Sequence, residues 1–296
     1  MDIILTGIAR SGTTLACSLL NKLPQCVALH EPMHPAQLAE LPYPEGYLDG
    51  ISAFFASQRK SLLESGTAAS KGRDGKIPDN PFGSIRLESG LRQSLCRNQV
   101  VRFEKPLHAD FRLLVKHPNF FTATLDGLRT RYPCYAIVRN PLGVLLSWHS
   151  VQAPVNEGRI KAAEAFDADL KATLASEPDR LTRQLIILRW CYSRYATLLP
   201  RGHVIRYEEM VASGGRALKV IDPAADLLSE PLDNRNVNTL YDSELVRGLA
   251  ARLLDEESIY GEFYSRAEVE SLCADWTESG TCTTNALHEP AASLFD

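Results

Sequence analysis

The sequence predicts an α/β fold, in which a central parallel sheet is flanked by helices in the three-layer arrangement of P-loop-like proteins. The first reason is the opening of the chain, where a strand-like run at residues 2–6 leads through a glycine-containing turn into a helical pattern and then into a second apolar run at residues 26–29. This order is that of a βαβ unit. The second reason is that strand-like and helical segments recur after residue 110. The composition, with 45% hydrophobic and 23% charged residues, is typical of a soluble globular protein with a large core.

Regular elements are predicted again after residue 110. Apolar runs predict strands at residues 112–116, 134–138 and 203–207. Helices are expected at residues 119–131, at 142–150 and around 245–253. The clearest periodicity is a series of leucines and tyrosines spaced alternately four and three apart, which predicts an amphipathic helix packed on the sheet. Its members are Leu181, Leu185, Leu188, Tyr192, Tyr195 and Leu199.

We expect a single domain over residues 1–296. Residues 33–110 are less regular and are predicted to be an insertion that builds the substrate side of the site. Within it, a helix is expected at residues 51–65. Residues 65–84 are rich in Gly, Ser, Lys, Asp and Pro and are expected to form a mobile loop. Residues 278–296 are expected to form a flexible tail.

The bulk properties exclude several classes of protein. The formal net charge of -4 shows no overall basicity, so no nucleic-acid partner is expected. The apolar start of the chain is followed closely by Gly7 and Arg10, which does not fit a signal peptide. No stretch approaches the ~18 apolar residues of a membrane span. The seven cysteines are scattered and never spaced as CxxC, which predicts reduced thiols in a cytoplasmic protein.

Residues 7–14, of sequence GIARSGTT, follow the first predicted strand and open a helix. Glycines allow the backbone N–H groups of such a loop to point inward at an anion, and the helix N-terminus adds a partial positive charge. We therefore expect anion binding by the second half of the loop, namely Arg10, Ser11, Gly12, Thr13 and Thr14. The loop is similar to a Walker P-loop, but Thr13 stands where the phosphate-binding lysine would be, and the cation lies earlier, at Arg10.

A second candidate anion site follows the strand predicted at residues 134–138. Arg139 ends this strand, and Ser147 lies about two turns into the next helix. Pro141 suits the first turn of that helix, because its missing N–H would have no partner there. A guanidinium and a hydroxyl so placed can bind one phosphate. A strand-end arginine in a surface ion pair is the alternative for Arg139 taken alone.

Residues 7–15 resemble the 5′-phosphosulfate loop of sulfotransferases that use 3′-phosphoadenosine 5′-phosphosulfate (PAPS). The closest form is PRSGTT, seen in tyrosylprotein and several carbohydrate and bacterial members, with Ala9 here in place of the proline. Arg139 and Ser147 resemble the 3′-phosphate site of that family, so the two sites together imply a donor with phosphates at both the 5′ and 3′ positions. Tyr207 resembles a family tyrosine near the nucleotide; a tyrosine that merely packs at its strand end is the alternative.

Charged residues at two other predicted strand ends are candidates for the chemistry. Glu31 follows the second strand, and open parallel sheets place their sites at the carboxyl ends of strands, so it could act as general base. Tyrosylprotein-type sulfotransferases carry a similar glutamate. Lys116 resembles the family lysine that stabilises the bridging oxygen as 3′-phosphoadenosine 5′-phosphate (PAP) departs. His117 is the second candidate base, offset by one position from the cytosolic sulfotransferase histidine, and His30 is the immediate alternative to Glu31.

The resemblance implies transfer of a sulfuryl group from PAPS to a hydroxyl or amine of a small molecule, lipid or carbohydrate, with release of PAP and without a metal. Arg10, Lys116 and the helix N-terminus would stabilise the charge that develops. Two alternatives are open. One is a P-loop nucleotide-dependent kinase or other phosphotransferase, with Lys116 recruited as its cation. The other is a protein that binds PAP or PAPS without turnover.

The resemblance covers residues 3–32 and 112–211. The Arg-Lys-Gly loop that grips the 3′-phosphate near the C-terminus of animal cytosolic members has no equivalent here, and residues 234–239 (NRNVNT) are a candidate for part of its role. The insertion and the late helices are expected to build the acceptor pocket. Neither the acceptor nor an oligomeric state is predicted.

Overall fold

The computed structural model describes residues 1–236 and 241–281, of which 277–281 are described by their backbone alone. Its main sheet consists of five parallel strands in the order β2-β7-β1-β8-β9. These strands are β1 (Asp2–Gly7), β2 (Cys26–His30), β7 (Arg112–Lys116), β8 (Cys134–Val138) and β9 (Val204–Arg206). The α/β fold with a central parallel sheet is therefore confirmed, as are the strands predicted from the apolar runs.

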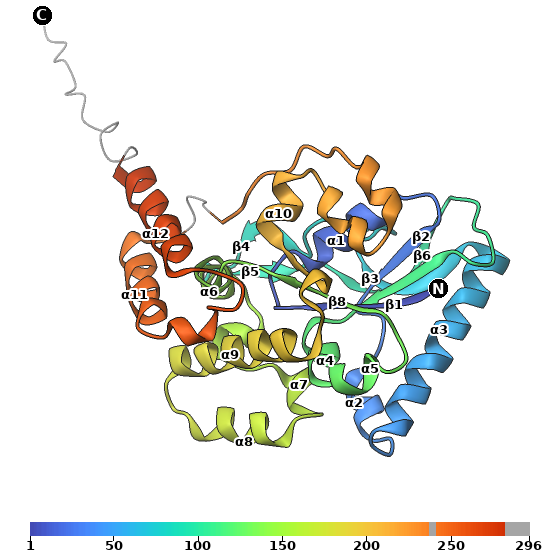
Figure 1. Ribbon diagram of the computed structural model, residues 1–296, viewed down its shortest axis with the longest axis horizontal. Helices are drawn as coiled ribbons and strands as arrows, with labels where there is room; N and C mark the ends of the chain where they lie inside the picture. Colours follow the sequence, from blue (N-terminus) through green and yellow to red (C-terminus); the bar gives the residue numbers. More distant parts are fainter. Residues whose placement is uncertain (237–240, 282–296) are drawn as a thin grey trace, which may run out of the picture.

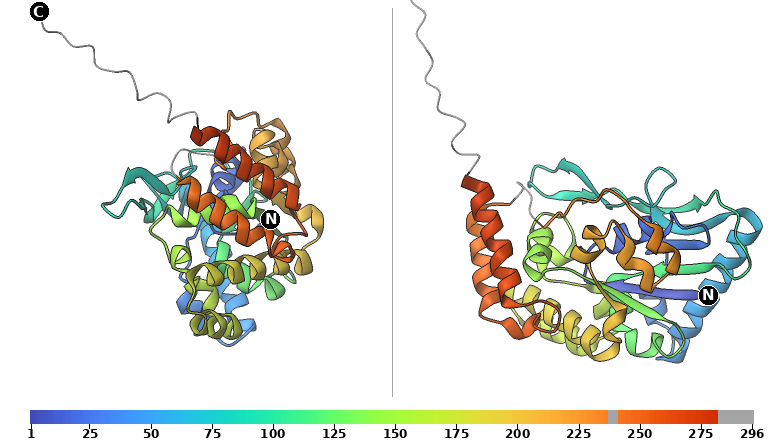
Figure 2. Two further views of the ribbon diagram at one scale, coloured as in Figure 1. Left: turned by 90° about the vertical axis from the view of Figure 1, so that its left-hand side faces the viewer. Right: turned by 45° about the horizontal axis from the view of Figure 1, so that its top comes forward.

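The helices surround this sheet. Their bounds are α1 (Thr13–Leu20), α2 (Pro35–Ala39), α3 (Glu45–Ser65), α4 (Pro118–Ala123), α5 (Leu125–Leu128), α6 (Pro141–His149), α7 (Lys161–Glu164), α8 (Ala168–Ser176), α9 (Arg180–Leu198), α10 (Tyr207–Ala212), α11 (Ser243–Leu254) and α12 (Arg266–Thr281). Figure 1 shows α1 and α10 on one face of the sheet, and α4, α5 and α9 on the other. Helices α11 and α12 pack beside α6 at one end of the molecule (Figure 2).

Two apolar cores lie on opposite faces of the sheet, because successive side chains of a strand point to opposite sides. Ile3 and Leu5 of β1 belong to the core formed with α1 and α10. Ile4, between them, belongs to the larger core on the other face, which includes Leu188 of α9. The helix predicted from the leucine and tyrosine periodicity is α9. Of that series, Leu185, Leu188, Tyr192 and Tyr195 are buried in this core, Leu181 is partly buried, and Leu199 follows the end of the helix. Helices thus cover both faces of the sheet, which is the predicted three-layer arrangement.

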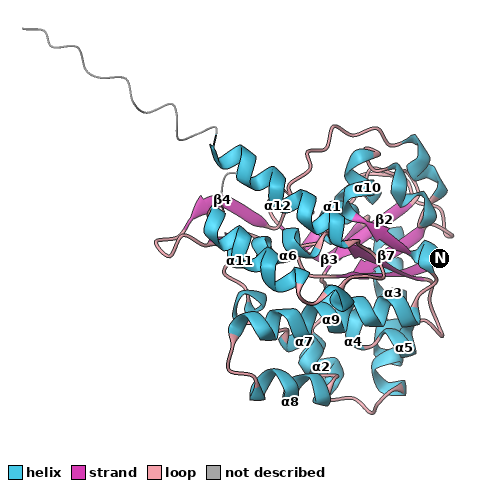
Figure 3. Ribbon diagram, turned by 60° about the vertical axis from the view of Figure 1, so that its left-hand side comes forward, coloured by secondary structure: helices cyan, strands magenta, loops and turns pink. Residues whose placement is uncertain are grey.

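The insertion between β2 and β7 is more ordered than expected. Strands β3 (Thr67–Gly72) and β6 (Arg97–Arg102) form an antiparallel pair, and β4 (Phe82–Arg86) pairs with β5 (Arg92–Ser94). The prediction of a mobile loop over residues 65–84 is thus wrong for β3. Small residues of β3, such as Ala68 and Ser70, are buried, and the Ser70 hydroxyl accepts a hydrogen bond from the backbone N–H of His30 at 2.9 Å. Figure 3 shows β4 at the tip of a hairpin that projects from the body.

Other boundaries also differ from the sequence-based predictions, and α3 begins at Glu45 rather than at residue 51. The helix expected over residues 119–131 is divided into α4 and α5 at Thr124, whose φ of -101° and ψ of 11° are not helical. Helix α12 extends to Thr281, so the start of the expected tail is helical, while residues 282–296 lie outside the described residues. Among the described residues, no helix is long and apolar enough to cross a membrane. The cysteines in that part of the chain are free thiols.

Candidate functional site

A cavity of about 820 Å³ opens at the carboxyl ends of the parallel strands, where open α/β sheets place their sites. The chain passes from β1 to β2 and β7 on one side and then crosses to β8 and β9, so β1 and its loop lie at the centre of this edge. All predicted site residues but one line the cavity. They are Arg10, Gly12, Thr13, Thr14, Glu31, Lys116, His117, Arg139, Ser147 and Tyr207.

Ser11 is the predicted site residue whose side chain does not line this cavity. It is fully buried, and its hydroxyl donates to the backbone carbonyl of Ile137 in β8 at 2.7 Å. The neighbouring loop residue Ile8 donates its N–H to the same carbonyl at 3.2 Å. The loop is thereby attached to the end of β8. The Ser11 side chain therefore fixes the loop to β8 and does not face the cavity.

Gly12 explains why the loop needs glycine immediately before α1. Its φ is 92°, a left-handed conformation that glycine adopts without strain. A Cβ at this position would also lie 2.7 Å from Cδ2 of Tyr207, closer than such atoms approach. The ring of Tyr207 therefore packs directly on the phosphate loop. This contact places Tyr207 beside the loop of residues 7–14, as the resemblance to a nucleotide-binding tyrosine implies.

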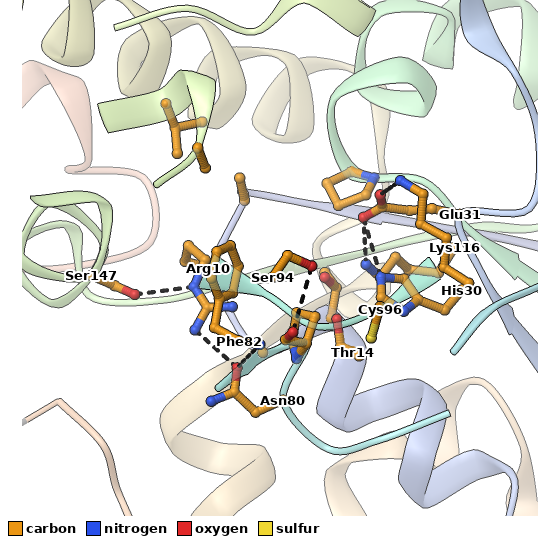
Figure 4. Close-up of a pocket in the computed structure, with 18 of the residues that line it drawn as sticks. Arg10, Thr14, His30, Glu31, Asn80, Phe82, Ser94, Cys96, Lys116 and Ser147 are labelled. Atoms are coloured by element: carbon orange, nitrogen blue, oxygen red, sulfur yellow. Dashed lines mark hydrogen bonds and ion pairs between the residues drawn. The ribbon is translucent and has the colours of Figure 1, made fainter. Parts of the chain in front are cut away.

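Arg10 connects the two anion sites that the sequence predicts separately. Its φ of 73° is left-handed, which is uncommon for a residue with a side chain. Its Nε donates to the Ser147 hydroxyl at 3.2 Å, and its Nη2 donates to Oδ1 of Asn80 at 3.2 Å. The guanidinium lies 4.5 Å from the centre of the Phe82 ring. Arg10 thus reaches from the loop after β1 to Ser147 of α6 and also contacts Asn80 and Phe82 of the insertion (Figure 4).

Arg139 is buried and bonded to neutral groups. Its Nη1 donates to the backbone carbonyl of Arg10 at 3.1 Å, its Nη2 to the carbonyl of Arg235 at 2.6 Å, and its Nε to Oδ1 of Asn236 at 2.6 Å. The guanidinium also lies 4.6 Å from the centre of the Tyr207 ring. Arg235 and Asn236 belong to the segment suggested for 3′-phosphate binding, whose residues 237–239 lie outside the described residues.

The positive charges of Arg10 and Arg139 have no carboxylate partner among the described residues. Within the described part of the chain, neither Arg10 nor Arg139 has a carboxylate oxygen within 4.0 Å, the limit for an ion pair. Burial, reinforced by the charges of Arg92 and Arg139, lowers the pKa of Arg10 to about 9. Arginines remain charged at neutral pH. An anion with several oxygens would therefore relieve their mutual repulsion and fill their free donors.

Glu31 lies on the other side of the cavity with Lys116 and His30 (Figure 4). Its Oε1 accepts from Nζ of Lys116 at 2.9 Å and lies 3.4 Å from Nε2 of His30, and its Oε2 accepts from Nζ of Lys71 at 2.9 Å. Burial raises the pKa of the Glu31 carboxyl, but the Lys116 ammonium, the His30 hydrogen bond and the Lys71 ammonium outweigh it. The pKa of Glu31 therefore lies well below its usual range, and the carboxylate is ionised at neutral pH.

His117 and His30 are buried and neutral at ordinary pH. Burial lowers the pKa of His117 to about 3, and that of His30 to about 4, the latter with help from the Lys116 charge. Nε2 of His117 and Nδ1 of His30 are buried and have no hydrogen-bond partner among the described residues. The rings of Phe120 and Phe121 pack edge-on against His117. A buried nitrogen without a partner is uncommon, so His117 stays a second candidate base.

The insertion contributes side chains that the sequence analysis did not identify as site residues. They are Lys71 from β3, Asn80 and Phe82 near the start of β4, and Arg92 from β5. No local motif surrounds them, and their strands carry few of the large apolar residues that mark a buried strand. Their place in the site follows only from the way in which the insertion folds over the ends of β1 and β2.

No family model and no curated protein matches this chain. Among solved structures, one that is similar is a sulfotransferase from Alicyclobacillus acidocaldarius, with a TM-score of 0.41 and 13% identity over 93% of this chain and 98% of that chain. Another is the sulfotransferase STF9 from Mycobacterium avium, with a TM-score of 0.34 and 15% identity over 94% of this chain and 76% of that chain. Because these scores and identities are low, the function has to be inferred from the site itself.

Proposed function

We propose that this protein is a PAPS-dependent sulfotransferase. The observation that carries the proposal is the composition of one cavity. Two arginines that have no carboxylate partner among the described residues lie on one side, and a lysine-paired glutamate lies on the other. The first group suits a ligand with more than one phosphate. The second suits an acceptor that must lose a proton beside a leaving group that gains negative charge.

The donor would bind at the central loop and at the start of α6. The loop N–H groups and the N-terminus of α1 would hold the 5′-phosphosulfate, with the hydroxyls of Thr13 and Thr14 beside it. Arg139 and Ser147 would hold the 3′-phosphate. The Tyr207 ring supports this arrangement because it packs between Gly12 of the loop and the Arg139 guanidinium. A ligand with phosphates at both positions would then contact both halves of the site at once.

Glu31 would be the base for the acceptor. In the transfer, the acceptor oxygen attacks sulfur, the bond from sulfur to the bridging oxygen breaks, and that oxygen leaves with the electron pair as part of PAP. Glu31 takes the acceptor proton. Lys116 carries three N–H donors, so its ammonium can bond Glu31 and the departing oxygen together. The low pKa of Glu31 makes it a weak base, so stabilisation of the leaving group by fixed positive charge would supply much of the catalysis.

The phosphotransferase alternative fits this geometry less well. The chain lacks the Walker lysine in the loop before α1, and Lys116, the cation that could replace it, comes instead from the end of β7, where its ammonium bonds Glu31 at 2.9 Å. The acceptor that we propose is a hydroxyl or amine of a small molecule, lipid or carbohydrate. It would enter the cavity beside Glu31, where residues of the insertion form part of the lining.

Calorimetric binding of PAP and of ATP with Mg²⁺ tests the donor. PAP at about 100 times its dissociation constant should stabilise the fold by about 2.7 kcal/mol, which is visible as a rise in melting temperature. Arg139→Ala should remove this effect, whereas Arg201→Ala, which removes an exposed arginine, should not. Binding of ATP with Mg²⁺ but not of PAP would overturn the proposal in favour of a phosphotransferase. A protein that binds PAPS but transfers sulfuryl groups to no phenol, alcohol, sugar or amine would be a binding protein.

A further inference from the structure

Arg92, the first residue of β5, is attached to the helix that carries Ser147. Its backbone N–H donates to the carbonyl of Ser150 at 3.0 Å, and its carbonyl accepts from the N–H of Gln152 at 2.9 Å. Ser150 ends α6, and its hydroxyl donates to the carbonyl of Ser147 at 2.8 Å. Although Arg92 comes from the insertion, two backbone hydrogen bonds therefore fix it beside the proposed 3′-phosphate site.

The side chain of Arg92 has an N–H donor without a partner among the described residues. It lines the cavity, and its Nη2 donates to the Ser150 hydroxyl at 2.8 Å. Its Nε is buried and has no hydrogen-bond partner among the described residues. In the same part of the chain, no carboxylate lies within ion-pair distance of Arg92. A half-buried guanidinium with an unused donor is costly unless a ligand completes it.

The charges around Arg92 are mostly of the same sign. Burial lowers its pKa, and the nearby charges of Arg86, Arg235 and Arg139 lower it further, against an opposite effect of Tyr241. Arg92 is in turn the charge that most strongly lowers the pKa of Arg10. Arg235 is paired with Asp79 at 3.4 Å, but no carboxylate of residues 1–236 and 241–276 pairs with Arg10, Arg92 or Arg139 in this way. Three buried or half-buried arginines converge on one end of the cavity.

We propose that Arg92 is a further donor-binding residue, which binds the 3′-phosphate of the nucleotide together with Arg139 and Ser147. The inference rests on the proposed function. Attachment to Ser150 places Arg92 beside Ser147 on α6, which assigns it to the 3′-phosphate rather than to the 5′-phosphosulfate on the loop before α1. The insertion then does more than build the acceptor wall, because it also completes the site for the donor.

Calorimetry with PAP and with AMP, which is the same nucleotide without the 3′-phosphate, tests this assignment. In wild type, PAP should bind more tightly than AMP. Arg92→Ala should weaken PAP by about 10–100-fold, the loss expected for charge-assisted hydrogen bonds, and should change AMP affinity by less than about 3-fold. Arg92→Lys should recover part of the loss for PAP. Arg102→Ala, which removes an exposed arginine of the same insertion, should leave both affinities unchanged.

The outcomes separate this inference from the proposed function. If wild type prefers PAP and Arg92→Ala keeps that preference, or loses PAP and AMP equally, the inference is wrong and the donor assignment stands. If wild type binds PAP no better than AMP, the proposed function fails and the inference fails with it. Melting temperatures without ligand show whether Arg92→Ala folds. If it does not, Arg92→Gln replaces it, because glutamine keeps part of the aliphatic chain without the charge. This variant should likewise lose affinity for PAP but not for AMP.

Discussion

Lys116 and Glu31 are joined twice, once through the backbone and once through their side chains. The N–H of Glu31 donates to the carbonyl of Lys116 at 2.8 Å, and Nζ of Lys116 donates to Oε1 of Glu31 at 2.9 Å. The backbone bond continues the register of β2 on β7, in which His30 lies opposite Lys116. Glu31 itself has a left-handed φ of 46°, which turns the chain away from the strand while its carboxylate stays beside the lysine.

Glu31→Gln should lower turnover by about 100–1,000-fold, because it removes the proposed base and keeps the shape of the side chain. PAP affinity should change little, since Glu31 lies away from Arg10 and Ser147 (Figure 4). The measurement is the rate of PAP release from PAPS with an acceptor found by screening. His117→Ala is the comparison. Loss of turnover only in His117→Ala would make His117 the base, and near-normal rates in both variants would refute the mechanism.

Lys71→Ala should raise the pKa of the Glu31 carboxyl, because the Lys71 ammonium favours the ionised form. Carbon NMR of the side-chain carboxyls measures this pKa without any acceptor, and Glu31→Gln identifies the signal. In wild type, Glu31 should titrate well below the usual range for glutamate. Lys60→Ala removes an exposed lysine of α3 and should not move the titration. An unchanged midpoint in Lys71→Ala would show that Lys116 and the His30 hydrogen bond hold the carboxylate ionised without Lys71.

The buried histidines should make the fold sensitive to acid. The pKa of His117 is about 3 in the folded protein and about 6.5 when unfolded, so below pH 6.5 the unfolded chain binds a proton that the folded protein does not. The free energy of unfolding should therefore fall as the pH drops from about 6.5 towards 3, by about 1.4 kcal/mol per pH unit for this group. Above pH 6.5 the contribution is constant.

Urea unfolding at a series of pH values measures this slope. His117→Gln should make the loss of stability between pH 6.5 and 4 less steep, because one of the protons taken up on unfolding is removed. His108→Gln, at an exposed position, should keep the wild-type slope. His30, whose pKa is about 4, adds a second contribution of the same sign. Equal slopes in His117→Gln and wild type would mean that His117 is protonated in the folded state.

The sequence predicts best those features that depend on residues close together in the chain. The strand limits of β7 and β8 agree with the predicted ranges 112–116 and 134–138, because each contains a run of apolar residues that is buried on both faces. The loop between β1 and α1 was also predictable, since a glycine before a helix N-terminus is a local signal. The strand β3 was missed, because its sequence TAASKG contains small and polar residues and becomes a strand only by pairing with β6.

The sequence by itself determined the parallel sheet and the glycine-containing loop at Arg10, because each depends on residues close together in the chain. The assignment of Arg10 and Arg139 to two anion sites stays a prediction. Only the tertiary structure decided which side chains meet. Lys71 and Glu31 are 40 positions apart, and Arg10 and Ser147 are 137 apart, yet each pair is in contact. Such contacts follow from the sheet order and from the fold of the insertion over its edge, which no periodicity or spacing in the sequence expresses.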